Sequence, residues 1–218
     1  DSGSNLFIAD YNNGRVRRVD VQTGLISTVA GNGAANGQVS PVPDGTPALL
    51  GYLSYPMWVS FDRSGYLLIS ENGSSSIQRV DGAGTLRLVA GNGQGGFTGD
   101  GLLATKAGIG QASNVVTDAA GNLVFGDLNG RVRRIDASSG LIYTIAGIGQ
   151  STGGAGSCKG GSVGDGGPST QAVLDGVVNA LAMPNGNLLL SDMVDCRVRL
   201  VGLPSPHPYT ATNLTANP

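Results

Sequence analysis

The fold is decided by the segment Asn5-Leu-Phe-Ile-Ala-Asp10, followed by Arg15-Val-Arg-Arg-Val-Asp20 and Leu25-Ile-Ser-Thr-Val-Ala-Gly31. Each of these pieces is a short run of apolar and β-branched residues that ends in Asp or Gly, which is typical of a strand followed by a turn. The Asn-Gly and Thr-Gly pairs between them supply the positive φ angles that tight hairpin turns require. The segment therefore predicts three consecutive antiparallel strands.

The first two pieces return three more times along the chain, and the third piece returns twice, at residues 86–91 and 141–147. The first piece reappears at residues 66–71, 122–127 and 187–192. Before each of these copies lies one more apolar run, at residues 57–62, 114–118 and 177–182. The repeats therefore begin near residues 5, 66, 122 and 187, and each complete repeat predicts a four-stranded antiparallel sheet.

Composition agrees with a turn-rich, all-β chain. Glycine accounts for 37 of the 218 residues and charged residues for 13%, against ordinary values of about 7% and 25%. Glycine at this density disfavours long helices, and it lacks the three-residue period of collagen. The net charge of −2 gives no long-range attraction for nucleic acid or anionic lipid. No apolar run approaches the ~20 residues of a membrane span.

The repeat resembles the NHL repeat, in the long-period form found in bacterial and eukaryotic extracellular proteins such as teneurins. The resemblance includes the connector Gly99-Asp-Gly-Leu-Leu-Ala-Thr-Lys-Ala107 and its copy Gly164-Asp-Gly-Gly-Pro-Ser-Thr-Gln-Ala172. It implies an all-β fold, a β-propeller built of four-stranded blades. We expect about four blades over residues 1–202 and a Pro-rich tail or linker over residues 203–218.

The strands do not add up to a closed ring. The repeats supply 14 strands, whereas four closed blades need 16, and NHL propellers usually have six blades. We therefore expect the chain to be part of a larger ring. The alternative is a distorted four-bladed ring in which residues 209–214 form the last strand. A partial ring leaves a blade face bare, so further blades or a partner should cover it.

Cysteines and sequons indicate an extracellular location. Cys158 lies in the longest connector and Cys196 in a hairpin turn, and the topology brings these two segments to one face, so we expect a disulfide between them. The alternative is two unrelated thiols. Asn72-Gly-Ser74 and Asn213-Leu-Thr215 are acceptor sites for N-glycosylation in a secreted chain.

Recurring charged residues have structural interpretations. The arginines of the Arg-Val-Arg-Arg motifs, residues 15–18 and 131–134, can pair with carboxylates that recur at strand ends, so nucleic-acid binding is not expected. Glu71 occupies one of these strand-end positions and is expected to be structural. The Asp-Gly connectors offer too few oxygens for calcium, and their aspartates are expected to cap turns before short helical stretches: Asp44, Asp100 and Asp165.

No catalytic constellation or cofactor site is expected. The only histidine, His207, lies in the Pro-rich tail, so the histidine-held metal of the amidating lyase that shares this fold has no counterpart. The sequence favours a non-catalytic interaction or scaffolding module of a secreted or cell-surface assembly, with protein partners or further domains of the same polypeptide. Residues 32–55 and 148–176 are its expected recognition surface. The alternative is part of a propeller enzyme or metal-dependent ligand binder with its site at the central channel.

Overall fold

The computed structural model describes residues 1–34, 40–149, 163–202 and the backbone of 210–213. Short strands and tight turns dominate this part of the chain. Three single-turn 3-10 helices are the helical elements described, namely η1 (Tyr11–Asn13), η2 (Ala104–Lys106) and η3 (Ser169–Gln171). None of the described helices is long and apolar enough to cross a membrane.

The strands form four separate antiparallel sheets in chain order. The first sheet contains β1 (Leu6–Asp10), β2 (Arg15–Val19) and β3 (Ile26–Ala30). The second contains β4 (Pro56–Phe61), β5 (Leu67–Glu71), β6 (Ser76–Val80) and β7 (Leu86–Ala90). The third contains β8 (Ala112–Thr117), β9 (Leu123–Asp127), β10 (Arg131–Ile135) and β11 (Ile142–Ala146). The fourth contains β12 (Val177–Ala182), β13 (Leu188–Asp192), β14 (Arg197–Gly202) and β15 (Thr210–Asn213).

Each sheet follows the predicted repeat, so the strand assignments made from the sequence are confirmed. Neighbours in sequence pair antiparallel in every sheet, as in the register of Leu67 with Val80 and of Leu123 with Ile135. The segment offered as a last strand does form β15, which pairs with β14. The described chain therefore has 15 strands, one more than the repeats alone supply.

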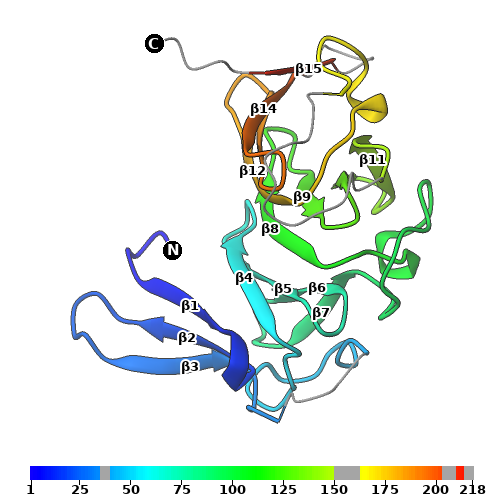
Figure 1. Cartoon of the computed structure of the whole chain (residues 1–218). Helices are drawn as coiled ribbons and strands as arrows, with labels where there is room; N and C mark the ends of the chain where they lie inside the picture. The colour runs from blue at the N-terminus through cyan, green and yellow to red at the C-terminus, as the bar shows by residue number, and fades with distance from the viewer. Residues whose placement is uncertain (35–39, 150–162, 203–209, 214–218) are drawn as a thin grey trace.

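The sheets stack face to face along an arc (Figure 1). The strands β4, β8 and β12 lie at one edge of their sheets and contact one another in that order. The first and last sheets stand at opposite ends of the arc, and the ring is open between them in this view (Figure 1).

Three apolar clusters fill the spaces between successive sheets. Val16 and Ala30 of the first sheet pack with Ile69 and Leu86 of the second. Leu68 and Ile77 of the second sheet pack with Phe125 and Ile142 of the third, and a third cluster joins the last two sheets. Because alternate side chains of a strand point to opposite faces, each internal sheet must be apolar on both faces, which explains runs such as Leu67-Leu-Ile69.

Candidate functional site

A carboxylate ends the second strand of each four-stranded sheet and holds the loop that leads into that sheet. We call these loops the first connector (residues 31–55), the second connector (91–111) and the third connector (147–176). Glu71 accepts a hydrogen bond from the backbone N–H of Ser54. Asp127 accepts one from Gly110 at 3.1 Å and Asp192 one from Asp175 at 3.0 Å. All three carboxylates are buried, and they anchor connectors to the sheets.

Buried arginines bridge the same carboxylates to the Asp-Gly turns of the connectors. Arg133 lies 3.6 Å from Asp127 and 2.8 Å from Asp100. Arg199 repeats this arrangement, with Asp192 at 3.6 Å and Asp165 as the second partner. Both guanidinium groups are fully buried. We call each of these arrangements an arginine bracket, because one cation ties a connector to a strand.

The second sheet replaces the bracket by a neutral partner. Gln78 stands in the position of the arginine and donates a hydrogen bond to Glu71 at 2.8 Å. The connector aspartate, Asp44, turns instead to Arg87 at 3.1 Å and to the N–H of Leu88 at 2.9 Å. The second sheet therefore pairs a glutamate with a glutamine, whereas the third and fourth sheets pair an aspartate with an arginine.

These contacts confirm one interpretation from the sequence and correct another. Arg17, Arg18 and Arg133 do pair with recurring carboxylates, as predicted, whereas Arg15 and Arg131 donate to backbone carbonyls. The expectation that Asp44, Asp100 and Asp165 cap turns before short helical stretches is wrong, because the hydrogen bonds of their carboxylates in the described residues go to distant strands, and η2 and η3 have no side-chain cap. Those aspartates bind arginines on strands more than 30 residues away along the chain.

Burial changes the acid strength of these carboxyl groups. Removal from water raises the pKa of Glu71 to about 7, in spite of the hydrogen bonds from Ser54 and Gln78. Burial also raises the pKa of Asp192 to about 6 and that of Asp127 above its usual range. Glu71 has no arginine bracket, which agrees with a pKa above that of Asp192.

Stability is expected to fall as the pH rises from 5 to 8. Between the unfolded pKa of Glu71, near 4.5, and its folded pKa, near 7, the unfolded chain loses its proton first, so ionisation favours unfolding by up to about 3 kcal/mol. Urea unfolding should show this slope, and Glu71→Gln should flatten it without abolishing it, because Asp192 titrates in the same range. Equal slopes in the two proteins would contradict the assignment to Glu71. The hydrogen-bonded Asp136, with a pKa near 2, does not interfere in this range.

The predicted modification sites lie on or near hairpin turns. Asn72 is half-buried in the turn between β5 and β6, and its amide donates to the Tyr11 hydroxyl at 3.3 Å. Ser74 of the same sequon is fully buried. Asn213 ends β15, whereas Thr215 lies outside the described residues. Glycosylation of either asparagine stays a prediction.

The cysteine pair is only half described. Cys196 lies in the turn between β13 and β14, with a positive φ of 53°, and its sulfur is disulfide-bonded. Cys158 lies outside the described residues, so the pairing itself stays a prediction.

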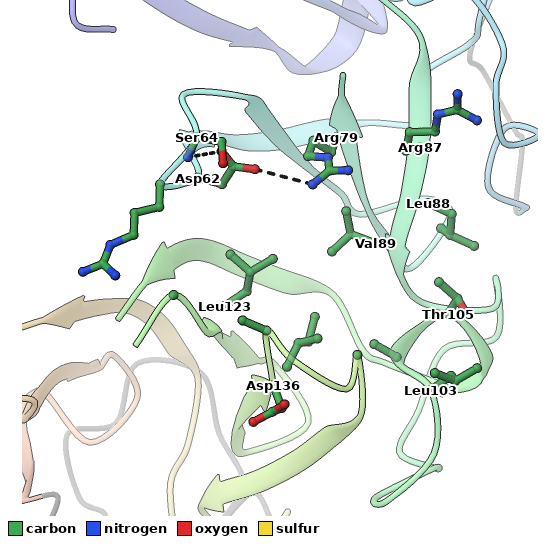
Figure 2. Close-up of a pocket in the computed structure, with 16 residues that line it drawn as sticks. Asp62, Ser64, Arg79, Arg87, Leu88, Val89, Leu103, Thr105, Leu123 and Asp136 are labelled. Atoms are coloured by element: carbon green, nitrogen blue, oxygen red, sulfur yellow. Dashed lines mark hydrogen bonds and ion pairs between the residues drawn. The ribbon is translucent and has the colours of Figure 1, made fainter. Parts of the chain in front are cut away.

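A pocket of about 500 Å³ opens between the second and third sheets (Figure 2), and nothing in the sequence pattern indicated it. Val89 and Leu123 form part of its apolar wall, and Asp62 lies 3.7 Å from Arg79 at its rim. Arg87, also at the rim, is bonded to Asp81 at 2.8 Å. Two of the arginines that line the pocket are therefore held in ion pairs, Arg79 with a carboxylate of the lining and Arg87 with a carboxylate outside it. Among the described residues, no three His, Cys, Asp or Glu side chains are grouped so that they could hold a metal ion.

Comparisons with known proteins identify the fold. No family model matches the chain, and no curated protein does. Among solved structures, an auxiliary nutrient binding protein from Bacteroides ovatus superposes with a TM-score of 0.63 at 19% identity, over 92% of this chain and 46% of its own. A gluconolactonase from Xanthomonas campestris gives 0.62 at 13% identity, over 100% and 60%. A streptogramin B lyase gives 0.56 at 14% identity, over 99% and 53%.

The similarity to these solved structures is a similarity of fold. The chain spans about half the length of the structures it matches, and identities this low carry no substrate or reaction across. Four consecutive antiparallel sheets that pack face to face, together with these neighbours, show that the described chain consists of blades of a β-propeller.

Proposed function

We propose that the chain is a non-catalytic interaction or scaffolding module of NHL type, whose blades belong to a larger extracellular propeller assembly. The observation that carries the proposal is the surface at the two ends of the arc. Each end presents side chains of the kind that internal sheets bury against a neighbour. A monomeric soluble domain rarely leaves such surfaces uncovered.

The first end is the face of β1–β3 that points away from the second sheet. Leu6, Ile8 and Ile26 lie on it with 60%, 37% and 53% of their surface exposed. By register, Ile8 and Ile26 correspond to Phe125 and Ile142 of the third sheet, which are fully buried against the second sheet. The same positions are thus buried wherever a preceding sheet exists.

The second end is the outer face of β12–β14. Leu181 and Val198 are 58% and 50% exposed there. Asn179 on the same face corresponds to Asn114 of the third sheet, whose amide bonds both the N–H and the C=O of Ala180 in the next sheet, at 2.8 and 3.0 Å. Among the described residues Asn179 has no such partner, although its position is the one that joins successive sheets.

The recurring acids support the non-catalytic part of the proposal. Glu71, Asp127 and Asp192 are all used to anchor connectors. Although gluconolactonases and a lyase share the architecture, no described residue group favours their chemistry over a binding role. The disulfide at Cys196 supports the extracellular part, because disulfides persist in oxidising compartments.

Sedimentation velocity tests the proposal on the chain itself. The two end faces differ, so we expect reversible head-to-tail association, seen as a sedimentation coefficient that rises with protein concentration. Leu181→Glu combined with Val198→Glu should keep the chain monomeric, because it places charges on one of the two faces. Leu102→Glu is the matched control: Leu102 is 53% exposed but lies in the second connector, outside both end faces and outside the expected recognition surface, so association should persist. A wild-type coefficient independent of concentration would contradict the proposal.

A further inference from the structure

An arginine, Arg17, lies on the outer face of the first sheet, at the strand position that carries the bracket arginine in the third and fourth sheets. Arg17 lies opposite Ile8 in the register of β1 and β2. Arg133 lies opposite Phe125, and Arg199 opposite Leu190, in the same places of the third and fourth sheets. Arg17 therefore occupies, in the first sheet, the position that a bracket arginine has in the third and fourth sheets.

A complete bracket takes its second carboxylate from the connector that precedes the sheet. Asp100, bonded to Arg133, belongs to the second connector, and Asp165, bonded to Arg199, belongs to the third. The second connector also places the Phe97 ring 4.7 Å from the Arg133 guanidinium. Where glutamine replaces the arginine, at Gln78, the connector aspartate binds elsewhere. An arginine at this position thus goes together with a connector carboxylate.

Arg17 has only half of this arrangement. Its nearest carboxylate is Asp10 of its own sheet, at 3.9 Å, and the described residues give it no ion pair with a connector carboxylate. The guanidinium side chain is 30% exposed, whereas Arg133 and Arg199 are fully buried. In the third and fourth sheets the corresponding arginine has a connector aspartate as its second partner.

The adjoining strand has a free edge. In the other three sheets the strand equivalent to β1 pairs on both sides, as β9 does with β8 and β10. Within the described chain β1 pairs with β2 alone. Those backbone N–H and C=O groups of Leu6–Asp10 that point away from β2 therefore face an incoming strand.

We propose that the β1–β3 face binds the Asp-Gly connector and inner strand of another repeat of this same type, with the connector aspartate completing the bracket at Arg17 and the strand extending the sheet at β1. This inference rests on the proposed function and names the partner of one of its two faces. Apolar cover for Leu6, Ile8 and Ile26, a carboxylate for Arg17 and a strand for β1 are three requirements that one such segment meets together.

The probe is a synthetic peptide with the sequence of residues 97–117, which contains Phe97, Asp100, η2 and β8 and therefore supplies each of these groups. Binding to the full 218-residue chain is measured by fluorescence anisotropy, at a concentration where the chain is monomeric. The bound site is located by hydrogen exchange, in which the amides of Leu6–Asp10 that point away from β2 should become protected. Arg17→Ala and the peptide carrying Asp100→Asn should each weaken binding about ten-fold, because each removes one charged hydrogen-bond partner.

Arg18→Ala is the matched control, since Arg18 is the next residue of β2 and pairs with Asp20 at 3.0 Å; affinity should be unchanged. Absence of binding, protection outside β1, or equal affinity for Arg17→Ala and wild type would each overturn the inference. Sedimentation of the chain alone reports separately on the proposed function, so association that persists without peptide binding would reject only the partner named here.

Discussion

Replacing Gly91 by alanine is expected to destabilise the protein by at least about 3 kcal/mol. Gly91 directly follows β7, has a φ of +92°, and donates its N–H to the carbonyl of Ala104 at 3.0 Å. A Cβ at this position would lie 2.2 Å from the carbonyl oxygen of Ser75 and 2.8 Å from the Cα of Ser76. Because both are backbone atoms, no rotamer change relieves the clash, and the left-handed conformation adds about 1–2 kcal/mol of its own.

Gly84→Ala separates the steric effect from the conformational one. Gly84 also has a positive φ, +74°, but no atom lies within 4 Å of its Cβ position. Gly84→Ala should therefore lower the free energy of unfolding only by the cost of the positive φ angle, about 1 kcal/mol. Urea unfolding of the two variants measures the difference, and equal losses would show that the approach of Gly91 to the backbone of Ser75 is not what requires glycine there.

The turn for which Gly91 is required could be recognised from the sequence. Val-Ala-Gly or Ile-Ala-Gly ends the last strand of the first three repeats, at Gly31, Gly91 and Gly147, and all three have positive φ. Local patterns of this kind predicted the strands closely: the piece at residues 66–71 became β5 (Leu67–Glu71). The periodicity of side chains along a strand and the glycine at its end are local properties, and local properties can be read from one sequence.

The arginine brackets could not be read in the same way. Asp100 and Arg133 are 33 residues apart, and their contact depends on how the second connector folds over the third sheet. A signal was nevertheless present within the chain, since the one sheet with Gln78 in place of arginine also has Glu71 in place of aspartate. Such paired changes indicate contact without showing its geometry.

Burial of a strand likewise depends on its neighbours as well as on its own residues. Because successive side chains of a strand point to opposite faces, the apolar run Leu6-Phe-Ile8 is typical of a strand buried on both faces. Phe7 does pack against Phe61 of the second sheet, with ring centroids 4.9 Å apart. Leu6 and Ile8 point the other way and remain exposed. The residues of the strand are thus suited to burial on both faces, and in the described chain only the face toward the second sheet is covered.

Arg133→Gln is expected to cost about 3–4 kcal/mol of unfolding free energy, because it leaves Asp127 and its charge buried without a cation. Asp127 is fully buried and would retain only the hydrogen bonds from Gly110 and Asn129, both at 3.1 Å. Arg63→Gln, on an exposed arginine in a turn, is the control and should change stability by less than about 0.5 kcal/mol. Urea unfolding at pH 6 measures all of these variants.

The corresponding pair of residues in the second sheet indicates a double variant that should restore the stability lost in Arg133→Gln. Combining Arg133→Gln with Asp127→Glu copies the pair of Gln78 and Glu71, which is bonded at 2.8 Å in the same fold position. The double variant should recover most of the lost stability at pH 6, where a carboxyl group like that of Glu71, with a pKa near 7, is largely neutral. It should recover less at pH 8, where burial of the ionised carboxylate is again unfavourable. A double variant no more stable than Arg133→Gln at pH 6 would show that the two kinds of bracket are not interchangeable, and that each depends on the connector packed over it.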